Sequence, residues 1–323
     1  MDSSVNREQL IPVQTLEADS ASLASPMLRS NPMIWEGEAQ ADGVFVGLSN
    51  DADPLAILSA APVALPTVPR LPEDFVASAR LRVWFETLRN GLERQIAGTS
   101  GGSERFDLNG LNAVDQQAVR EVLGEGEVSG SVTLDGVDLT LEEALLPGVW
   151  RVTGGGAEWV EVGSVPEAVI IAADSLEPAP FAVPAGTDDA AVAAWGPSIM
   201  NAPAVLHEVS ERAAACAAEP SVDGALNHVI NFTLLPMSDS DERMLLDVLG
   251  RAALSLRSGG FGDCRVMATR YRHVWAVQFV NAMGNPVLDT LEIGAVPQSI
   301  CAQQTDFEDA LERLDDLLEA YLQ

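Results

Sequence analysis

One passage occurs twice in this sequence, in two diverged versions. The run LNAVDQQAVREVLGEGEVSG contains Asp115, and the similar run MSDSDERMLLDVLGRAALSL contains Asp241. Two later blocks recur in the same order, and these are residues 149–150 with 274–275 and residues 161–166 with 292–297. Self-similarity of this kind indicates that each copy is one structural unit. The chain is therefore predicted to hold two tandem pseudo-repeats, and function is expected where the copies differ.

Each copy is predicted to contain a capped helix. Asn112 and Ser238 are residue types that cap helix N-termini, and each is followed three positions later by an acid, Asp115 or Asp241. Glycine is a common stop signal for helices. The two helices are therefore expected to end at Gly124 and Gly250.

β-Branched and aromatic residues then predict strands in both copies. Because short turns join these strands, each copy is expected to be an α+β unit with a small, mainly antiparallel sheet. The expected strands are 128–134, 149–153 and 158–162 in the first copy and 264–269, 274–280 and 287–293 in the second, with turns at 270–273 and 284–285.

These patterns divide the chain into four predicted segments. Residues 1–70 are rich in Ser, Ala, Pro and acids and are expected to be a mostly disordered tail. Residues 71–175 form the first, diverged repeat, and residues 176–199 form a Pro- and Ala-rich linker. Residues 200–323 form the second repeat, which ends in an amphipathic helix.

Three further helices are predicted outside the repeated passages. One spans 203–218, and another spans 72–96 with an apolar face of Phe75, Ala79, Val83, Leu88 and Leu92. The C-terminal helix is predicted to be capped by Thr305, with Glu308 three residues on. Its apolar stripe is expected to pack on the sheet, with partner binding as the alternative, and comprises Phe307, Leu311, Leu314, Leu318 and Leu322.

The charge of the chain excludes several classes of function. The formal net charge of −30 argues against nucleic acid and anionic membrane surfaces as partners. The sequence contains arginine but no lysine, which excludes phosphate-loop lysines, Schiff bases and lysine general bases. The three cysteines have no CxxC spacing, so a reducing cytoplasm is expected. No apolar run is long and continuous enough for membrane insertion.

The second copy departs from the first in a Gly-rich run at 258–265, which contains Cys264. Cys264 could be a nucleophile with His273 as its base, a metal ligand with Cys301, or a buried core thiol. The acids at the start of the second helix fit the helix dipole better than acid–base chemistry. Trp150 and Trp275 are expected in the core. Arginines near the run, which include Arg243, Arg265 and Arg270, suit pairing with carboxylates at an interface.

A family resemblance rests on the second copy. It is carried by LLPMSDSDER at 234–243, GFGDCR at 260–265, Val274 with Trp275, DTLE at 289–292 and Val296 with Pro297. Together these residues resemble the C-terminal region of hydrogenase expression and formation proteins of the HupH/HyaF type. The resemblance spans about 232–301, and the first copy resembles a diverged counterpart of this region in the same family.

This resemblance implies a non-enzymatic accessory protein for the maturation of uptake [NiFe] hydrogenases. The expected partners are the small subunit precursor, bound before export, and a thioredoxin-like accessory protein. No catalytic residue and no cofactor is implied. The alternative is an iron–sulfur or redox carrier that uses Cys264 and Cys301. The candidate partner-binding residues are Pro236, Met237, Asp241, Arg243, Gly260, Phe261, Gly262, Cys264, Arg265, Arg270, Trp275 and Glu292.

Overall fold

The computed structural model describes residues 71, 75–218, 227–259, 263–281 and 286–321. The expected disordered tail at 1–70 lies outside the described residues. The same holds for Gly260, Phe261, Gly262 and the expected turn at 284–285.

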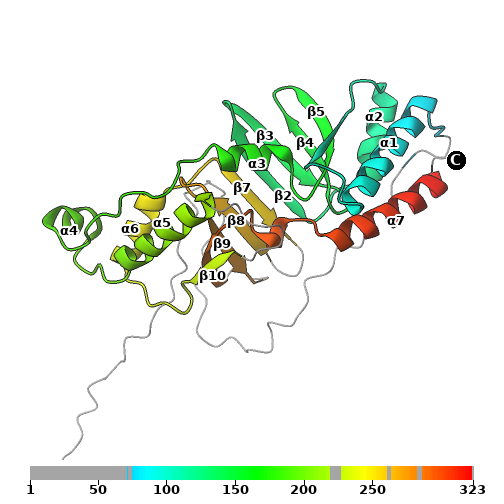
Figure 1. The fold of residues 1–323 in the computed structure, drawn as a ribbon. Coiled ribbons are helices and arrows are strands. Elements are labelled where there is room, and N and C mark those ends of the chain that lie inside the picture. The colour runs from blue at the N-terminus through cyan, green and yellow to red at the C-terminus, as the bar shows by residue number, and fades with distance from the viewer. Residues whose placement is uncertain (1–70, 72–74, 219–226, 260–262, 282–285, 322–323) are drawn as a thin grey trace, which may run out of the picture. The chain divides into compact units, whose positions relative to one another are not determined.

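The described residues form one antiparallel sheet and seven α-helices (Figure 1), which confirms the α+β class. The helices are α1 (Ala79–Ile96), α2 (Ala113–Leu123), α3 (Glu167–Asp174), α4 (Asp189–Trp195), α5 (Ala202–Ala218), α6 (Asp239–Leu249) and α7 (Gln304–Tyr321). The strands are β1 (Glu104–Asp107), β2 (Val128–Leu134), β3 (Val137–Glu143), β4 (Val149–Gly154), β5 (Ala157–Val162), β6 (His228–Asn231), β7 (Leu254–Ser258), β8 (Asp263–Ala268), β9 (Val274–Val280) and β10 (Pro286–Ile293). A short 3-10 helix, η2 (Gln298–Ile300), follows β10.

The two halves of the chain share this sheet. Its strand order is β1-β5-β4-β3-β2-β7-β8-β9-β10-β6, and the halves meet where β2 pairs with β7. Gly130 lies opposite Leu256 at that junction, and a Cβ on Gly130 would lie 2.4 Å from the Ser255 carbonyl oxygen. Only glycine fits this close approach of two backbones. The strand order is the one that two copies of a five-stranded unit would give, and the duplication stays a prediction.

Two predicted helices that start the repeated passages are confirmed. The Asn112 side chain accepts hydrogen bonds from the backbone amides of Val114 and Asp115 at the start of α2. Ser238 and Asp241 form a capping box at the start of α6. The helix expected at 203–218 is also present, as α5.

The first predicted helix is wrong in its start and in part of its apolar face. It begins at Ala79 because the Ser78 side chain accepts a hydrogen bond from the Leu81 amide and so caps it there. The predicted face includes Val83, which is 60% exposed. The buried face consists of Leu81, Phe85, Leu88, Gly91 and Leu92, so Leu88 and Leu92 were predicted correctly.

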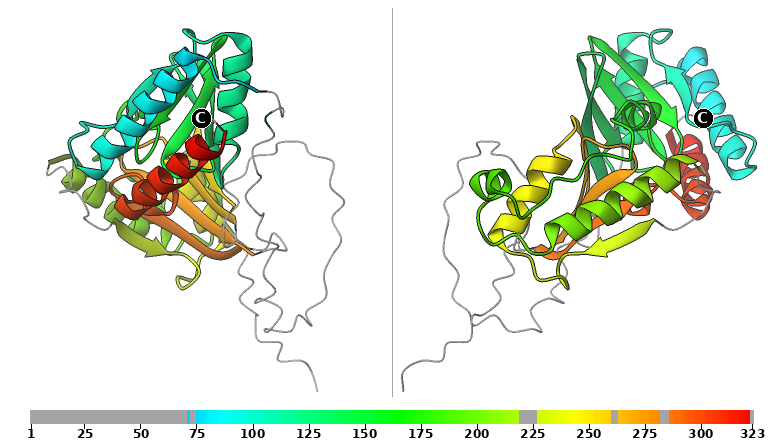
Figure 2. Two further views of the ribbon diagram at one scale, coloured as in Figure 1. Left: turned by 90° about the vertical axis from the view of Figure 1, so that its right-hand side faces the viewer. Right: turned by 60° about the vertical axis from the view of Figure 1, so that its left-hand side comes forward.

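The C-terminal helix also differs from the prediction. Thr305 lies inside α7 rather than at its cap, and the Gln303 amide donates to the Asp306 carboxylate at the helix start. The apolar side of α7 packs along α1 (Figure 2) and contributes Phe307 and Leu314 to a core cluster of the first half. The helix α7 therefore packs on α1 in addition to the predicted sheet.

Sequence reasoning missed β1, β3, β6, β7, α3 and α4. The predicted linker contains α4 and packs on the second half, where Phe181 stacks on Tyr271 with ring centroids 4.0 Å apart. The segment after β2 is a hairpin turn, because Asp135 and Gly136 both have positive φ.

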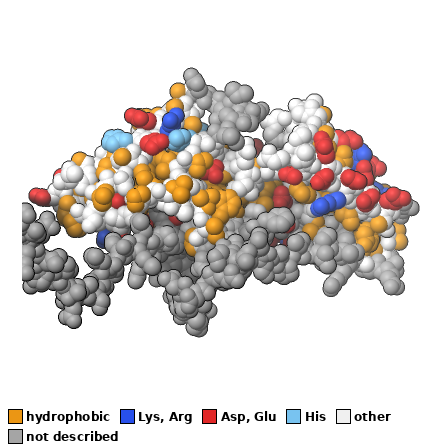
Figure 3. Space-filling view, turned by 90° about the horizontal axis from the view of Figure 1, so that it is seen from below, with side chains coloured by type: hydrophobic (Ala, Val, Ile, Leu, Met, Phe, Trp, Pro, Cys, Tyr) orange, Lys and Arg blue, Asp and Glu red, His pale blue; other side chains and the backbone are white. Residues whose placement is uncertain are grey.

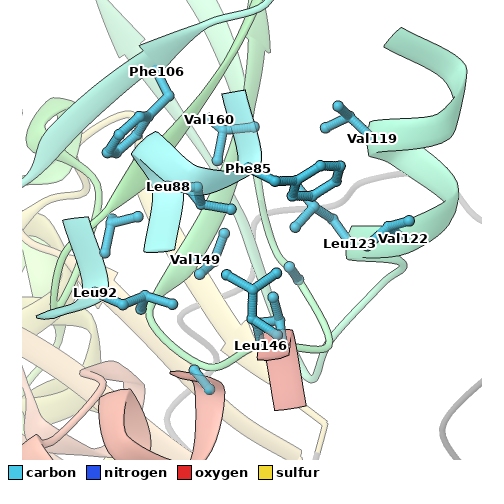
Figure 4. Close-up of a cluster of buried hydrophobic side chains, with 14 of the residues drawn as sticks. Phe85, Leu88, Leu92, Phe106, Val119, Val122, Leu123, Leu146, Val149 and Val160 are labelled. Atoms are coloured by element: carbon cyan, nitrogen blue, oxygen red, sulfur yellow. The ribbon is translucent and has the colours of Figure 1, made fainter. Parts of the chain in front are cut away.

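Three core clusters hold the fold together. Side chains of α1, α2 and α7 pack on one face of the first half, as Figure 4 shows for Phe85, Leu88 and Val149. Side chains of α5 and α6 pack on the corresponding face of the second half. The third cluster lies on the opposite face of the sheet, under α3, and includes both Trp150 and Trp275. The two tryptophans are therefore core residues, as predicted.

A candidate partner-binding surface in the second half

Asp241 is the most densely hydrogen-bonded of the candidate residues. Its side chain has no exposed surface. Oδ1 accepts the backbone amides of Met200, Asn201 and Ala202 at 2.8, 2.9 and 2.9 Å. Oδ2 accepts the Ser238 amide at 3.0 Å and the Ser238 hydroxyl at 2.8 Å. One carboxylate thus joins the N-termini of α5 and α6.

The pKa of Asp241 reflects these contacts. Burial pushes the pKa up, but hydrogen bonds from the Ala202, Met200 and Ser238 amides outweigh burial and hold it below its ordinary value. Asp241 is therefore a buried carboxylate with a structural role, and any effect on a partner surface is indirect.

Asp115 makes fewer contacts at the corresponding position of the first half. Its Oδ2 accepts the Ser78 hydroxyl at 2.7 Å and the Asn112 side-chain amide at 2.8 Å. Since Ser78 caps α1, this acid also links a repeat helix to the helix that precedes it.

Two loops lie against each other beside Asp241. The Asn201 side-chain amide donates to the Pro236 carbonyl oxygen at 2.6 Å, and the Ser238 hydroxyl lies 2.5 Å from the Ser198 carbonyl oxygen. Pro236 is exposed and Met237 is half-buried. The structure therefore brings Pro236, Met237 and Asp241 together at the start of α6.

Carboxylates border these loops. Glu242 is partly buried, and burial together with the charges of Asp239, Asp289 and Asp241 raises its pKa to about 7. Asp289 lies beside the loop, since its amide donates to the Thr233 hydroxyl and its carbonyl oxygen accepts the Phe232 amide.

Two of the candidate arginines lie at the two ends of α6. Arg243 is exposed, and its Nε donates to the Asp239 carbonyl oxygen at 2.9 Å. Arg270 lies over Gly250, which has φ of +57° and ends the helix. Cations suit the C-terminal end of a helix, so Arg270 complements α6 electrostatically. Arg265 is half-buried on β8.

The cysteine candidates lie on the other face of the sheet. Cys264 is buried and its thiol lies 3.4 Å from the Ser299 hydroxyl, while the Cys301 thiol lies 3.3 Å from the Pro297 carbonyl oxygen. Burial raises the pKa of both thiols, that of Cys301 to about 11. Protonated thiols are poor nucleophiles and poor metal ligands. Glu292, which is half-buried, accepts a hydrogen bond from Asn227 at 3.1 Å.

The pairing of Cys264 with His273 as nucleophile and base is wrong. β8 and β9 form a hairpin in which Cys264 lies opposite Phe279, whereas His273 is in the turn at the far end. At about 3.3 Å per strand residue this separation is far beyond hydrogen-bond reach. Among the described residues, no group of three or more His, Cys, Asp and Glu side chains is arranged to hold a metal ion.

The described candidates thus do not form one site. Pro236, Met237, Asp241 and Arg243 lie at the start of α6, and Arg270 lies at its other end. Cys264 and Trp275 belong to the core cluster on the opposite face. Sequence reasoning missed Met200 and Asn201, which precede α5 and contact the start of α6 although they are far from it in sequence.

The sequence of the chain is similar to those of known proteins. Residues 199–321 match the family described as HupH hydrogenase expression protein, C-terminal conserved region. Hydrogenase expression/formation protein HupH of Rhizobium leguminosarum bv. viciae is 39% identical over 223 residues, which are 67% of this chain and 74% of that protein. The chain belongs to the HupH family.

A second HupH, from Rhodobacter capsulatus, is 36% identical over 222 residues, which are 68% of this chain and 74% of that protein. A solved structure of hydrogenase expression protein HupH from Thiobacillus denitrificans ATCC 25259 aligns with a TM-score of 0.34 at 21% identity, over 38% of this chain and 98% of its own. The HupH C-terminal region contains α5, α6 and the loops that Asp241 joins. No helix among the described residues is long and apolar enough to cross a membrane.

Proposed function

We propose that this chain is a non-enzymatic accessory protein in the maturation of an uptake [NiFe] hydrogenase. It binds the iron–sulfur small subunit precursor in the cytoplasm before export, together with a thioredoxin-like accessory protein. Family membership carries the proposal, since the curated relatives are named hydrogenase expression/formation proteins.

The chemistry of the described residues supports a binding role. The thiols of Cys264 and Cys301 have raised pKa values and lie in or beside a hydrophobic cluster. A thiol enzyme needs a cysteine whose pKa is lowered toward its working pH, so these two thiols do not support thiol chemistry. The exposed loops at the start of α6 offer a protein surface instead.

The net charge of −30 supports a basic partner segment. A precursor destined for twin-arginine export carries arginines in its leader, and an acidic protein attracts such a segment over long range. The same charge keeps a complex with an immature subunit in solution.

The test is co-expression with a tagged small subunit precursor, followed by anaerobic purification and measurement of bound iron. We expect stoichiometric capture, with no iron on this protein when it is purified alone. A matched experiment with the small subunit lacking its leader measures the contribution of the leader. The proposal would be refuted if neither the precursor nor the small subunit lacking its leader were captured.

The alternative is an iron–sulfur or redox carrier that uses Cys264 and Cys301. The raised thiol pKa values disfavour thiolate ligation at neutral pH. Iron bound to the isolated protein, and lost in a variant with both cysteines replaced by alanine, would favour the carrier over the chaperone.

A further inference from the structure

Two segments that precede α5 and α6 and are joined by the bond from Asn201 to Pro236 carry apolar residues at the surface, and we call these residues the apolar ridge. Met200 is 75% exposed and Leu234 is 81% exposed. Apolar side chains from separate segments that gather on a surface mark a site of protein contact. Figure 3 shows hydrophobic side chains gathered over the middle of one face of the molecule. The ridge consists of Met200, Leu234, Leu235, Pro236 and Met237.

Hydrogen bonds hold the ridge in place. Asp241 fixes the backbone on either side of Met200, and the bond from Asn201 to the Pro236 carbonyl oxygen ties the second segment to the first. Leu235 and Met237 are half-buried against the core of the second half. A preorganised surface loses little conformational entropy on binding, which favours its use as a docking site.

The border of the ridge is negatively charged. Asp239 and Glu242 lie in the first turn of α6, next to the loop that carries Leu234 and Met237, and the neighbouring acids help to raise the pKa of Glu242. The guanidinium of Arg243 extends toward Gly196, and no ion pair of Arg243 occurs within the described parts of the chain. Mutual repulsion among these acids would be relieved by a bound cation.

We propose that the apolar ridge binds an apolar segment of a partner protein that carries Arg or Lys beside it. The proposal rests on the proposed function and narrows it to one surface and one chemistry of the bound segment. Apolar side chains of the segment would cover Met200 and Leu234, while its basic residues would lie over Asp239 and Glu242. Salt distinguishes the two contributions, because screening weakens the ionic contacts and leaves the apolar contacts nearly unchanged.

The experiment measures binding of three fluorescein-labelled peptides to the full chain. All three share one Leu- and Ala-rich stretch, which is flanked by Arg, by Gln or by Glu. We expect the Arg-flanked peptide to bind most tightly and the Glu-flanked peptide most weakly. Added NaCl should reduce the preference for Arg and leave the Gln-flanked peptide nearly unaffected.

Exposed positions allow matched variants. Leu234→Ser combined with Met200→Ser should weaken binding of all three peptides by about tenfold or more, because apolar contact area is lost. Val114→Ser, at a residue of the first half that is 66% exposed, should leave binding unchanged. Asp239→Asn with Glu242→Gln should abolish the preference for Arg, whereas Asp309→Asn with Asp316→Asn, on the exposed side of α7, should preserve it. Thermal unfolding verifies that each variant is folded.

The outcomes separate this proposal from the proposed function. Capture of the small subunit precursor by the wild type, with equal capture by the Leu234→Ser/Met200→Ser variant, would overturn the ridge and leave the proposed function intact. Selective peptide binding without precursor capture would overturn the proposed function and leave the ridge as a binding surface. A wild-type dimer that the same variant dissociates, with no peptide binding, would assign the ridge to a second copy of the chain and overturn the proposal.

Discussion

Replacing Asp241 by asparagine tests how α5 and α6 are joined. Both oxygens of the carboxylate accept hydrogen bonds, three at Oδ1 and two at Oδ2. An asparagine oxygen can replace Oδ1, but its amide group then points its own hydrogens at the Ser238 amide. Each lost hydrogen bond to a charged group costs about 1.5–3 kcal/mol, so the loss of two predicts a destabilisation of roughly 3–6 kcal/mol.

Asp115→Asn is the matched control. Both of the side-chain donors to Asp115, from Ser78 and Asn112, reach Oδ2, so an asparagine oxygen at that position can accept both. The expected cost is about 1 kcal/mol, which reflects the weaker bonds to a neutral acceptor. The assay is urea unfolding of the two variants, with the free energy of unfolding compared with that of the wild type. Equal destabilisation by Asp241→Asn and Asp115→Asn would refute the reasoning.

The pH dependence gives the same prediction a second readout. Because the pKa of folded Asp241 is held below its ordinary value, its stabilising contribution is complete above the unfolded pKa and is lost as the pH falls through the folded pKa. Asp241→Asn should therefore reduce the loss of stability in acid. An unchanged acid limb would show that the hydrogen bonds to Asp241 do not favour its charged form.

The other predictions concern the core, the junction and the thiols. Burial raises the pKa of Glu143 to about 7, so its protonated form favours the folded state and stability falls as the pH rises from the unfolded pKa to the folded one. Glu143→Gln should remove this fall in stability, which amounts to roughly 3 kcal/mol. The measurement is the urea midpoint of the variant at a pH below 4.5 and at a pH above 7, and a pH profile like that of the wild type would contradict the prediction. Gly130→Ala should cost roughly 2–4 kcal/mol because the new Cβ meets backbone atoms of the neighbouring strand, whereas Gly110→Ala, with open space around it, should change the unfolding free energy little. Cys264→Ala with Cys301→Ala should leave precursor capture and hydrogenase activity in cells unchanged, and loss of either in a folded variant would argue for thiol chemistry.

Local signals in the sequence predicted the elements that depend on local interactions. Asn112 and Ser238 cap α2 and α6 as expected, and the strands β2 and β9, which contain several valines, have the predicted bounds. These elements are determined by residues within a few positions of one another.

The remaining features depend on contacts between distant segments. β1 and β6 have four residues each and lie at the two edges of the sheet, so neither carries a sustained pattern. The start of α1 was predicted too early because Ser78, which caps the helix, is itself held by the distant Asp115. The roles of Asp241 were likewise hidden, since its donors at 200–202, just before and at the start of α5, are far from it in sequence.

The packing of α7 has a consequence for the order in which the protein is made. During synthesis the first half emerges from the ribosome well before residues 304–321, yet Phe307, Ala310 and Leu314 belong to its core. Until α7 arrives, the nascent first half leaves apolar side chains of α1 exposed to water and to other chains. The first half therefore closes only after residues 304–321 have been made, and a chain truncated before α7 is expected to aggregate.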